Sequence, residues 1–240
     1  MRRPDADRPA APEAAGPNAT ARLRRRRKPA RRDPELSKAL ILSAARDEFV
    51  EHGLNGARVD RIARRTGSGK NLIYHYFGNK EQLYLAVLEE IYREMRAHQD
   101  DEAVRHLPPL DGMRLLVANT FDYFVRTPAL TRLMSIENIH YAKHLKTSKT
   151  VRSLYDPLLE TLRIVLARGQ AAGAFRRDVE PIDLYISISA LAYFYLSNRH
   201  TLSWIFRQDL AEPQRLAQRR QHVVDMIIGY LCFGSAAPRT

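Results

Sequence analysis

Apolar side chains recur at helical spacing along most of this chain. Between Glu35 and His52 they form one stripe, and Gly53 is expected to end that helix because glycine adopts left-handed backbone angles without strain. The residues expected to face inward there are Leu36, Leu40, Ile41, Ala44, Ala45 and Phe49. Further helices are predicted over residues 70–77, 79–99, 111–126, 128–144, 151–173, 181–199 and 213–231. The alternation typical of strands is not sustained anywhere, so the pattern predicts an all-α fold.

Two short helices joined by a glycine-containing turn are predicted between Arg58 and Lys80. The run Thr66-Gly67-Ser68-Gly69 interrupts the helical pattern, and Ser68 is expected to cap the following helix. Turns of this kind join two helices at a steep angle. The stretch therefore predicts a helix-turn-helix, over about residues 57–76, whose second helix reads bases in a major groove of DNA.

Several short motifs around this stretch have a combined spacing that is specific, although each would be weak alone. They are Ile41-Leu42-x-Ala44-Ala45, Phe49, Gly53, Ile62-Ala63, Gly67 and Tyr74-His75-Tyr76-Phe77-x-Asn79-Lys80-Glu81-x-Leu83. With these residues, the run from Ala39 to Leu88 resembles the DNA-binding domain of the tetracycline-repressor (TetR) family of bacterial transcription regulators. The resemblance implies a C-terminal domain that binds an inducer or metabolite and a last pair of helices that packs against a twin subunit.

The chain departs from the usual pattern of that family in two places. Ala57 and Arg58 stand where Ser or Thr commonly caps the first short helix. Gly67-Ser68-Gly69 stands where Gly-Val-Ser usually precedes the second, which leaves the register of the base-reading side chains open.

Seven residues are expected to contact DNA. Base contacts are expected from the exposed end of the second short helix, and phosphate contacts from the residues after it. One of Tyr74 and Tyr76 could instead pack into the core of the three-helix unit. The expected DNA-binding residues are Arg58, Lys70, Asn71, Tyr74, His75, Tyr76 and Lys80.

Charge and composition divide the chain into three parts. Residues 1–34 are rich in Pro, Ala and Arg and are expected to be a disordered tail that carries a net charge of +7 out of the total of +12. Residues 35–98 are expected to form the DNA-binding domain and the start of a linker helix capped by Asn79, and residues 99–240 a helical ligand-binding and dimerisation domain. The basic balance favours a polyanionic partner, either nucleic acid or an anionic membrane surface.

The C-terminal helices are rich in aromatic residues. Such a helical bundle can hold a small organic ligand between its helices, although each ring singly could fill a core. The ligand itself remains open. The candidate ligand-binding residues are Phe121, Phe124, Met134, Glu137, Tyr141, Tyr185 and Tyr193.

The last two predicted helices carry more apolar residues than one buried face requires. A second subunit would bury the excess, and burial within the monomer core is the alternative. The residues concerned are Ile186, Ile188, Leu191, Tyr195, Ile227, Ile228 and Leu231.

No catalytic arrangement is evident in the sequence. Glycine-rich phosphate loops, nucleophile elbows and paired-histidine motifs are missing, so we expect neither an enzyme nor a cofactor. His140 and His144 lie four residues apart near Glu137, but such a triplet is common by chance, and no metal site is expected. The single cysteine and the lack of a long apolar segment favour the cytoplasm and argue against a membrane partner.

Together these observations predict a cytoplasmic homodimer that binds double-stranded DNA at a palindromic operator. It would act as a repressor released by a small-molecule ligand. The alternative from the same residues is a non-regulatory architectural DNA-binding protein that uses its basic tail.

Overall fold

Every regular element of the described chain is helical. The structure, a computed structural model, describes residues 33–97 and 101–233, so nearly all of the predicted Arg-rich tail lies outside the described residues. The elements are α1 (Pro34–Gly56), α2 (Val59–Thr66), α3 (Lys70–Phe77), α4 (Lys80–Ala97), α5 (Asp101–His106), α6 (Pro109–Arg126), α7 (Pro128–Ile139), the 3-10 helix η1 (Leu145–Thr147), α8 (Lys149–Ala171), α9 (Pro181–Ser197), α10 (Arg199–Phe206) and α11 (Pro213–Cys232). The all-α prediction is confirmed.

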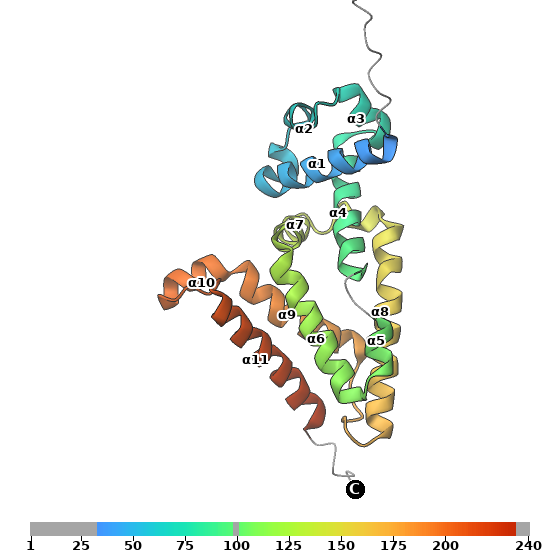
Figure 1. The fold of residues 1–240 in the computed structure, drawn as a ribbon, viewed down its shortest axis with the longest axis vertical. Helices are drawn as coiled ribbons and strands as arrows, with labels where there is room; N and C mark the ends of the chain where they lie inside the picture. The colour runs from blue at the N-terminus through green and yellow to red at the C-terminus, as the bar shows by residue number, and fades with distance from the viewer. Residues whose placement is uncertain (1–32, 98–100, 234–240) are drawn as a thin grey trace, which may run out of the picture.

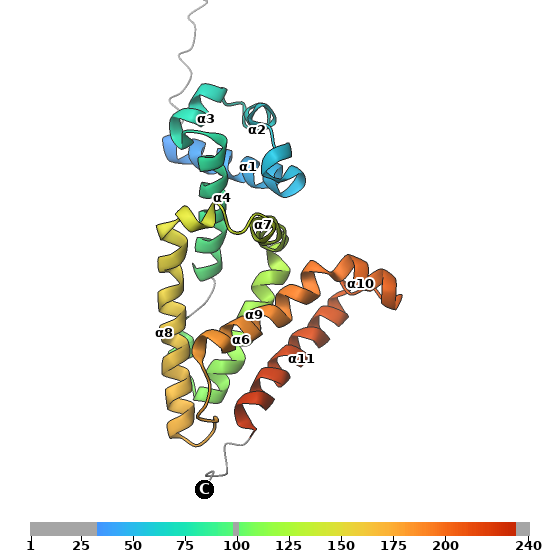
Figure 2. The same cartoon turned by 180° about the vertical axis from the view of Figure 1, so that it is seen from behind.

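Helix α4 connects a small three-helix unit to a larger bundle (Figure 1). Helices α1, α2 and α3 form the unit at one end, and α5 to α11 form the bundle, as the view from behind also shows (Figure 2). Asn79 caps α4 as expected: its side-chain oxygen accepts the Gln82 N–H at 2.8 Å, and the Gln82 side chain accepts the Asn79 N–H at 3.1 Å. The helix therefore starts within one part of the molecule and ends within the other.

Helix α1 contributes to the core of the three-helix unit. Ile41, Ala45 and Phe49 are fully buried, and Gly53, at φ 64°, leaves helical geometry as predicted. The prediction for Leu36 and Leu40 is wrong, because both side chains are at least half exposed. They lie about 100° around the helix from the buried face, which continues toward the N-terminus through Ser37 instead.

Polar contacts join the helices of the bundle. Arg220 on α11 donates to both carboxylate oxygens of Asp122 on α6, at 2.8 and 2.9 Å. Arg105 on α5 donates to the Thr161 hydroxyl on α8 at 2.9 Å. The Tyr123 hydroxyl donates to the carbonyl of Ile91 at 2.9 Å, so α6 is also held against α4. The short helices α5 and α10 were not predicted.

Most of the apolar residues named in the last two predicted helices are buried within the subunit. Ile186 is exposed and Leu191 is half-buried, whereas the other five residues are buried within the subunit: Ile188, Tyr195, Ile227, Ile228 and Leu231. For those five the alternative of a monomer core holds. Among the described residues no helix combines the length and the apolar character needed to cross a bilayer.

Candidate nucleic-acid interface

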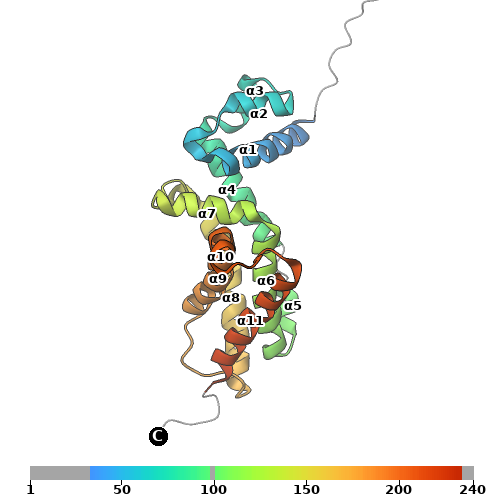
Figure 3. The ribbon, with the colours of Figure 1, turned by 90° about the vertical axis from the view of Figure 1, so that its left-hand side faces the viewer.

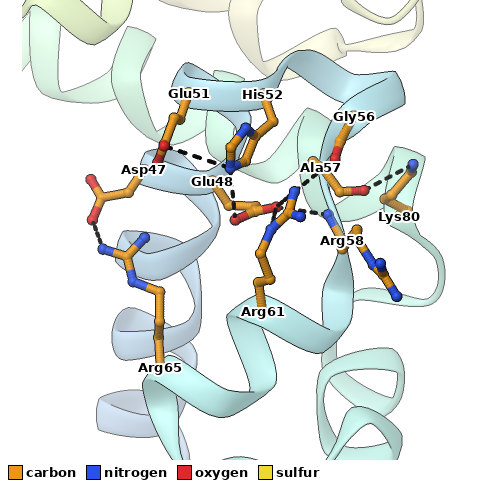
Figure 4. A network of polar contacts seen from close by, with 10 residues as sticks. All are labelled: Asp47, Glu48, Glu51, His52, Gly56, Ala57, Arg58, Arg61, Arg65 and Lys80. Atoms are coloured by element: carbon orange, nitrogen blue, oxygen red, sulfur yellow. Dashed lines mark hydrogen bonds and ion pairs between the residues drawn. The ribbon is translucent and has the colours of Figure 1, made fainter.

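The start of α2 is capped by a side chain from α1. Arg58, in the N-cap position, makes no side-chain capping bond, but Glu48 accepts its backbone N–H at 2.8 Å (Figure 4). The same oxygen accepts Nε–H of Arg61 at 2.7 Å, and Arg61 also donates to the carbonyl of Gly56 at 2.7 Å. Glu48 thus binds the N–H of the N-cap residue, as the acidic residue of a capping box does, and it ties α2 to α1.

The electrostatics of Glu48 follow from these bonds. Burial favours the neutral acid, but the bonds from Arg61 and from the Arg58 backbone outweigh burial and lower the pKa of Glu48. The same bond stabilises the charged form of Arg61 and raises the pKa of its guanidinium. Both groups are therefore charged at neutral pH, and the pair orients α2.

The turn between α2 and α3 is built around Gly67. This residue has φ 61°, and the Ser68 N–H donates to the carbonyl of Ala63 at 3.1 Å to close α2. The N-cap of α3 is Gly69, with no side-chain bond, so the expectation that Ser68 caps α3 is wrong. Ser68 belongs to the end of α2, and the next helix begins one residue later than a serine cap would place it.

One face of α3 is exposed and polar. Ile73 is buried and Leu72 and Phe77 are half-buried, which anchors the opposite face of the helix. The exposed residues follow the spacing of neighbours on a helix surface, i, i+1, i+4 and i+5. All four residues expected to read bases lie on this exposed face: Lys70, Asn71, Tyr74 and His75.

The residues expected on phosphates lie in a different environment. Tyr76 is half-buried, and the Lys38 ammonium of α1 lies 5.6 Å from its ring centroid. The alternative that one of the two tyrosines packs into the core therefore applies in part to Tyr76. Lys80 is half-buried and donates to the carbonyl of Ala57 at 3.3 Å, whereas Arg58 is exposed. Lys38 was not predicted as part of this surface, because Lys38 and Tyr76 lie far apart in the sequence.

A shallow groove lies beside the exposed face of α3. It is lined by Arg58, Asp60, Ala63, Arg64, Gly67 and Ser68. The Lys70 ammonium pairs with the Asp60 carboxylate, and Nη2 of Arg58 lies 3.8 Å from it. Asp60 therefore holds two cations, one on each side of the turn between α2 and α3.

In the bundle, the structure brings several predicted ligand residues close to other tyrosines. The ring centroid of Tyr155 lies 5.7 Å from that of Tyr185 and 6.1 Å from that of Tyr92. Burial raises the pKa of both Tyr92 and Tyr155. Phe124 lies 6.3 Å from Tyr193, whose hydroxyl is 2.8 Å from the Ser135 hydroxyl. We call this group of rings from α4, α6, α8 and α9 the tyrosine cluster.

The other predicted ligand residues are placed differently. Phe121 is buried in the core and Met134 is half-buried against it, whereas Tyr141 is 84% exposed outside the bundle. The prediction for Tyr141 assumed a helix to residue 144, but α7 ends at Ile139 and the backbone of Tyr141 is left-handed.

Glu137 is occupied by contacts within the chain. One carboxylate oxygen lies 2.8 Å from Nδ1 of His144, and the other accepts the backbone N–H groups of His144 and Leu145. His140 is exposed on a separate turn. Within residues 33–97 and 101–233, no three His, Cys, Asp or Glu side chains are grouped so that they could hold a metal ion.

Comparison with known proteins places both parts of the chain in one family. Residues 41–87 match the family described as bacterial regulatory proteins, tetR family, and residues 109–227 match the tetracyclin repressor-like C-terminal domain. The HTH-type transcriptional repressor NicS of Pseudomonas putida is 36% identical over 188 residues, which cover 78% of this chain and 89% of NicS. The chain belongs to the TetR family.

Two further proteins are similar to this chain. The HTH-type transcriptional repressor AcnR of Corynebacterium jeikeium is 32% identical over 145 residues, covering 60% of this chain and 70% of AcnR. The solved structure of the fatty acid degradation regulator FadR from Bacillus halodurans superimposes with a TM-score of 0.57 over 80% of this chain and 98% of FadR. Because FadR is 19% identical to this chain, the likeness shows a shared fold and no more.

Proposed function

We propose that this TetR-family chain is a homodimeric repressor that binds a palindromic operator and releases it when a small organic ligand binds in the bundle. The observation that carries the proposal is the face of α3, where Lys70, Asn71, Tyr74 and His75 are exposed together on a helix anchored by Ile73. Lysine, asparagine and histidine donors match the acceptors of base edges in the major groove. NicS and AcnR, both repressors by description, support the same assignment.

In a symmetric dimer, two α3 helices would enter successive major grooves about 34 Å apart. Tyr76, beside Lys38, and Lys80, beside Ala57, would then contact phosphates. The seven predicted DNA-binding residues and the division of the chain near residue 98 form part of this proposal. As a DNA-binding regulator of a bacterial family, the protein would act in the cytoplasm and would have a regulatory rather than an enzymatic role.

The ligand site that we propose is the tyrosine cluster. Tyr185, Ser189 and Tyr193 follow each other at intervals of four residues on α9, so they share one face of that helix. The Ser189 hydroxyl is buried and makes no hydrogen bond within the described part of the chain, which leaves it available to a ligand. Aromatic rings with hydroxyl groups at their edges fit a small, planar organic molecule with polar substituents.

Ligand binding would act on DNA through α4. Tyr92 of the cluster is on α4, and so is Tyr84, whose ring contacts Phe49 of α1. A shift of α4 would change the separation of the two α3 helices. The effect on affinity can be no larger than the preference of the ligand for one separation over the other.

The first test is selection of binding sites from random duplex DNA with the full chain at near-physiological salt. We expect a palindrome with half-sites about one helical turn apart. Recovery of no common sequence would favour the architectural alternative, in which the basic tail supplies the affinity.

The ligand site is tested with compounds that release the selected operator. Tyr193→Phe and Ser189→Ala should each reduce the response to such a compound while leaving operator affinity unchanged. Tyr141→Phe is the matched control, because this tyrosine is exposed outside the cluster. An equal loss in all three variants would contradict the proposed site.

A further inference from the structure

Helix α10 presents three consecutive large apolar side chains to solvent. Trp204 is 84% exposed, Ile205 56% and Phe206 61%. None of the eight residues of α10 is buried in the subunit. An isolated helix shorter than about 12 residues is marginal in water, because nucleation is costly and tertiary packing supplies most helical stability. The helix therefore lacks within its own subunit the burial that normally stabilises such an element.

The segment after α10 is nevertheless held by several hydrogen bonds. Arg207 adopts left-handed backbone angles, and the Ser203 carbonyl and hydroxyl accept the N–H groups of Gln208 and Leu210, each at 3.1 Å. Leu210 is buried, and its carbonyl accepts the Tyr195 hydroxyl of α9 at 2.9 Å. These bonds fix the end of α10 to α9. Trp204 is therefore exposed although the neighbouring backbone is held in place by these bonds.

The apolar surface of α10 continues onto its two neighbours. Viewed from the side of α10, helices α9, α10 and α11 lie on one face of the bundle (Figure 3). Nine of the fourteen exposed large apolar residues of the described chain lie on these three helices or directly after α11: Ile182, Ile186, Phe194, Trp204, Ile205, Phe206, Met226, Tyr230 and Phe233. We call this surface the apolar face.

The size of the apolar face indicates what covers it. With roughly 200 Å² for a fully exposed large side chain, the large apolar residues of α9, α11 and Phe233 expose roughly 650 Å². Those of α10 add roughly 400 Å² on the same reckoning. A stable interface buries about 800 Å² on each partner, so the face is large enough to form one, and α10 supplies more than a third of its exposed large apolar area.

We propose that α10 packs against a second copy of this chain, as an integral part of the dimer interface. The inference rests on the homodimer of the proposed function and goes beyond pairing of α9 with α11. In a two-fold symmetric dimer the same face is used twice, so each α10 is covered by the other subunit. Trp204, the largest and most exposed of the three consecutive apolar residues of α10, is the expected anchor of this contact.

Trp204 also reports on the proposal directly, because it is the only tryptophan in the chain. Its emission and its quenching by acrylamide are measured on the full chain, over concentrations at which sedimentation shows the monomer and dimer, with the urea-unfolded chain as the exposed reference. We expect blue-shifted emission and several-fold weaker quenching in the dimer. A dimer whose Trp204 is quenched as in the unfolded chain would overturn the inference and leave the proposed function intact. A chain that stays monomeric at all concentrations and on operator DNA would overturn both.

A second measurement uses substitutions on α10 that preserve the tryptophan. Ile205→Glu combined with Phe206→Glu should weaken dimerisation at least about tenfold, because it places two charges in an apolar contact. Tyr141→Glu is the matched control, since Tyr141 is as exposed as Trp204 but lies off the apolar face. Equal dimerisation of the α10 double variant and the control would contradict the proposal. So would shielding of Trp204 by anionic phospholipid vesicles in a chain that sediments as a monomer, because α10 would then be a membrane-binding helix.

Discussion

One carboxylate oxygen of Glu48, on α1, accepts both the backbone N–H of Arg58 and the Nε–H of Arg61. Glu48 thereby binds the N-cap residue of α2, as the acid of a capping box does, and forms an ion pair with Arg61. The orientation of α2, and through it of α3, depends on a side chain eleven residues before the helix begins.

Glu48→Gln should lower the free energy of unfolding by about 1–3 kcal/mol at pH 7, because it removes the charge from a buried hydrogen-bonded group. The folded-state pKa of Glu48 lies below its ordinary value of 4.5. Its stabilising contribution is therefore complete above that value and is lost as the pH falls through the lower folded-state pKa. Urea denaturation of both proteins at pH 7 and in the acid range measures the difference.

The nearby Glu51→Gln is the control for this substitution. Glu51 is exposed, and its carboxylate lies 3.7 Å from His52, so its loss should change stability by less than about 1 kcal/mol. If the Glu48→Gln difference stayed constant as the pH fell, the ion pair would not be the source of the stabilisation.

Lys70→Ala and Lys80→Ala should weaken DNA binding in different ways. Lys70 is exposed at the start of α3, so its loss should reduce affinity and relax base preference, as should that of Asn71. Lys80 should contact a phosphate, so its loss should weaken binding to all sequences alike and reduce the salt slope by about 1. Fluorescence anisotropy with the selected operator and its base-substituted versions, at several salt concentrations, distinguishes the two. The roles would be reversed if only Lys80→Ala altered base preference. Because Lys80 also bonds Ala57, thermal unfolding of both variants serves as the control.

Glu137→Gln should destabilise the connection between α7 and α8. The carboxylate is buried and bonded to the His144 ring and to two backbone N–H groups, so the expected loss is about 1–3 kcal/mol. Hydrogen exchange at residues 144–148 should accelerate as the bonds weaken. Glu160→Gln on the exposed side of α8, next to Arg163 at 3.5 Å, should leave both measurements unchanged. Unaltered exchange in the Glu137 variant would show that the loop is held by other contacts.

Gly169→Ala should cost about 1–3 kcal/mol of stability, because an added methyl group would overlap the buried Phe175 ring. Gly56→Ala is the matched control: its methyl group would meet only Cβ of His52 at an ordinary 3.4 Å. Thermal unfolding of the two variants should therefore give a lower Tm for the first alone. Equal Tm values would mean that Phe175 has room to move.

Much of the fold was predictable from the sequence because it depends on local patterns. The apolar spacing in α4, the Asn79 cap and the glycines at the ends of α1 and α2 all act within a few residues of their own positions. The exposed face of α3 followed for the same reason, and Ser68 failed as a cap by a shift of one residue.

The features that sequence reasoning missed depend on contacts between distant residues or on unusual exposure. The cap from Glu48 is invisible to a rule that examines only the residue before a helix. Leu36 and Leu40 satisfy an apolar pattern but lie beside the buried face. Helix α10 follows α9 after Asn198 without proline or glycine, so no local signal separated it from its neighbour.

Helix α4 belongs to two cores at once. Its first half carries Tyr84, which contacts Phe49, and its second half buries Ile91, Tyr92 and Met95 against the bundle. A fragment ending at Ala97 would leave these last three side chains in water, at a cost of roughly 1.5–3 kcal/mol each. Such a cost is comparable with the whole stability of a small domain. The DNA-binding end is therefore not expected to fold well alone, and truncations that aim to isolate it should fail in expression before they fail in binding.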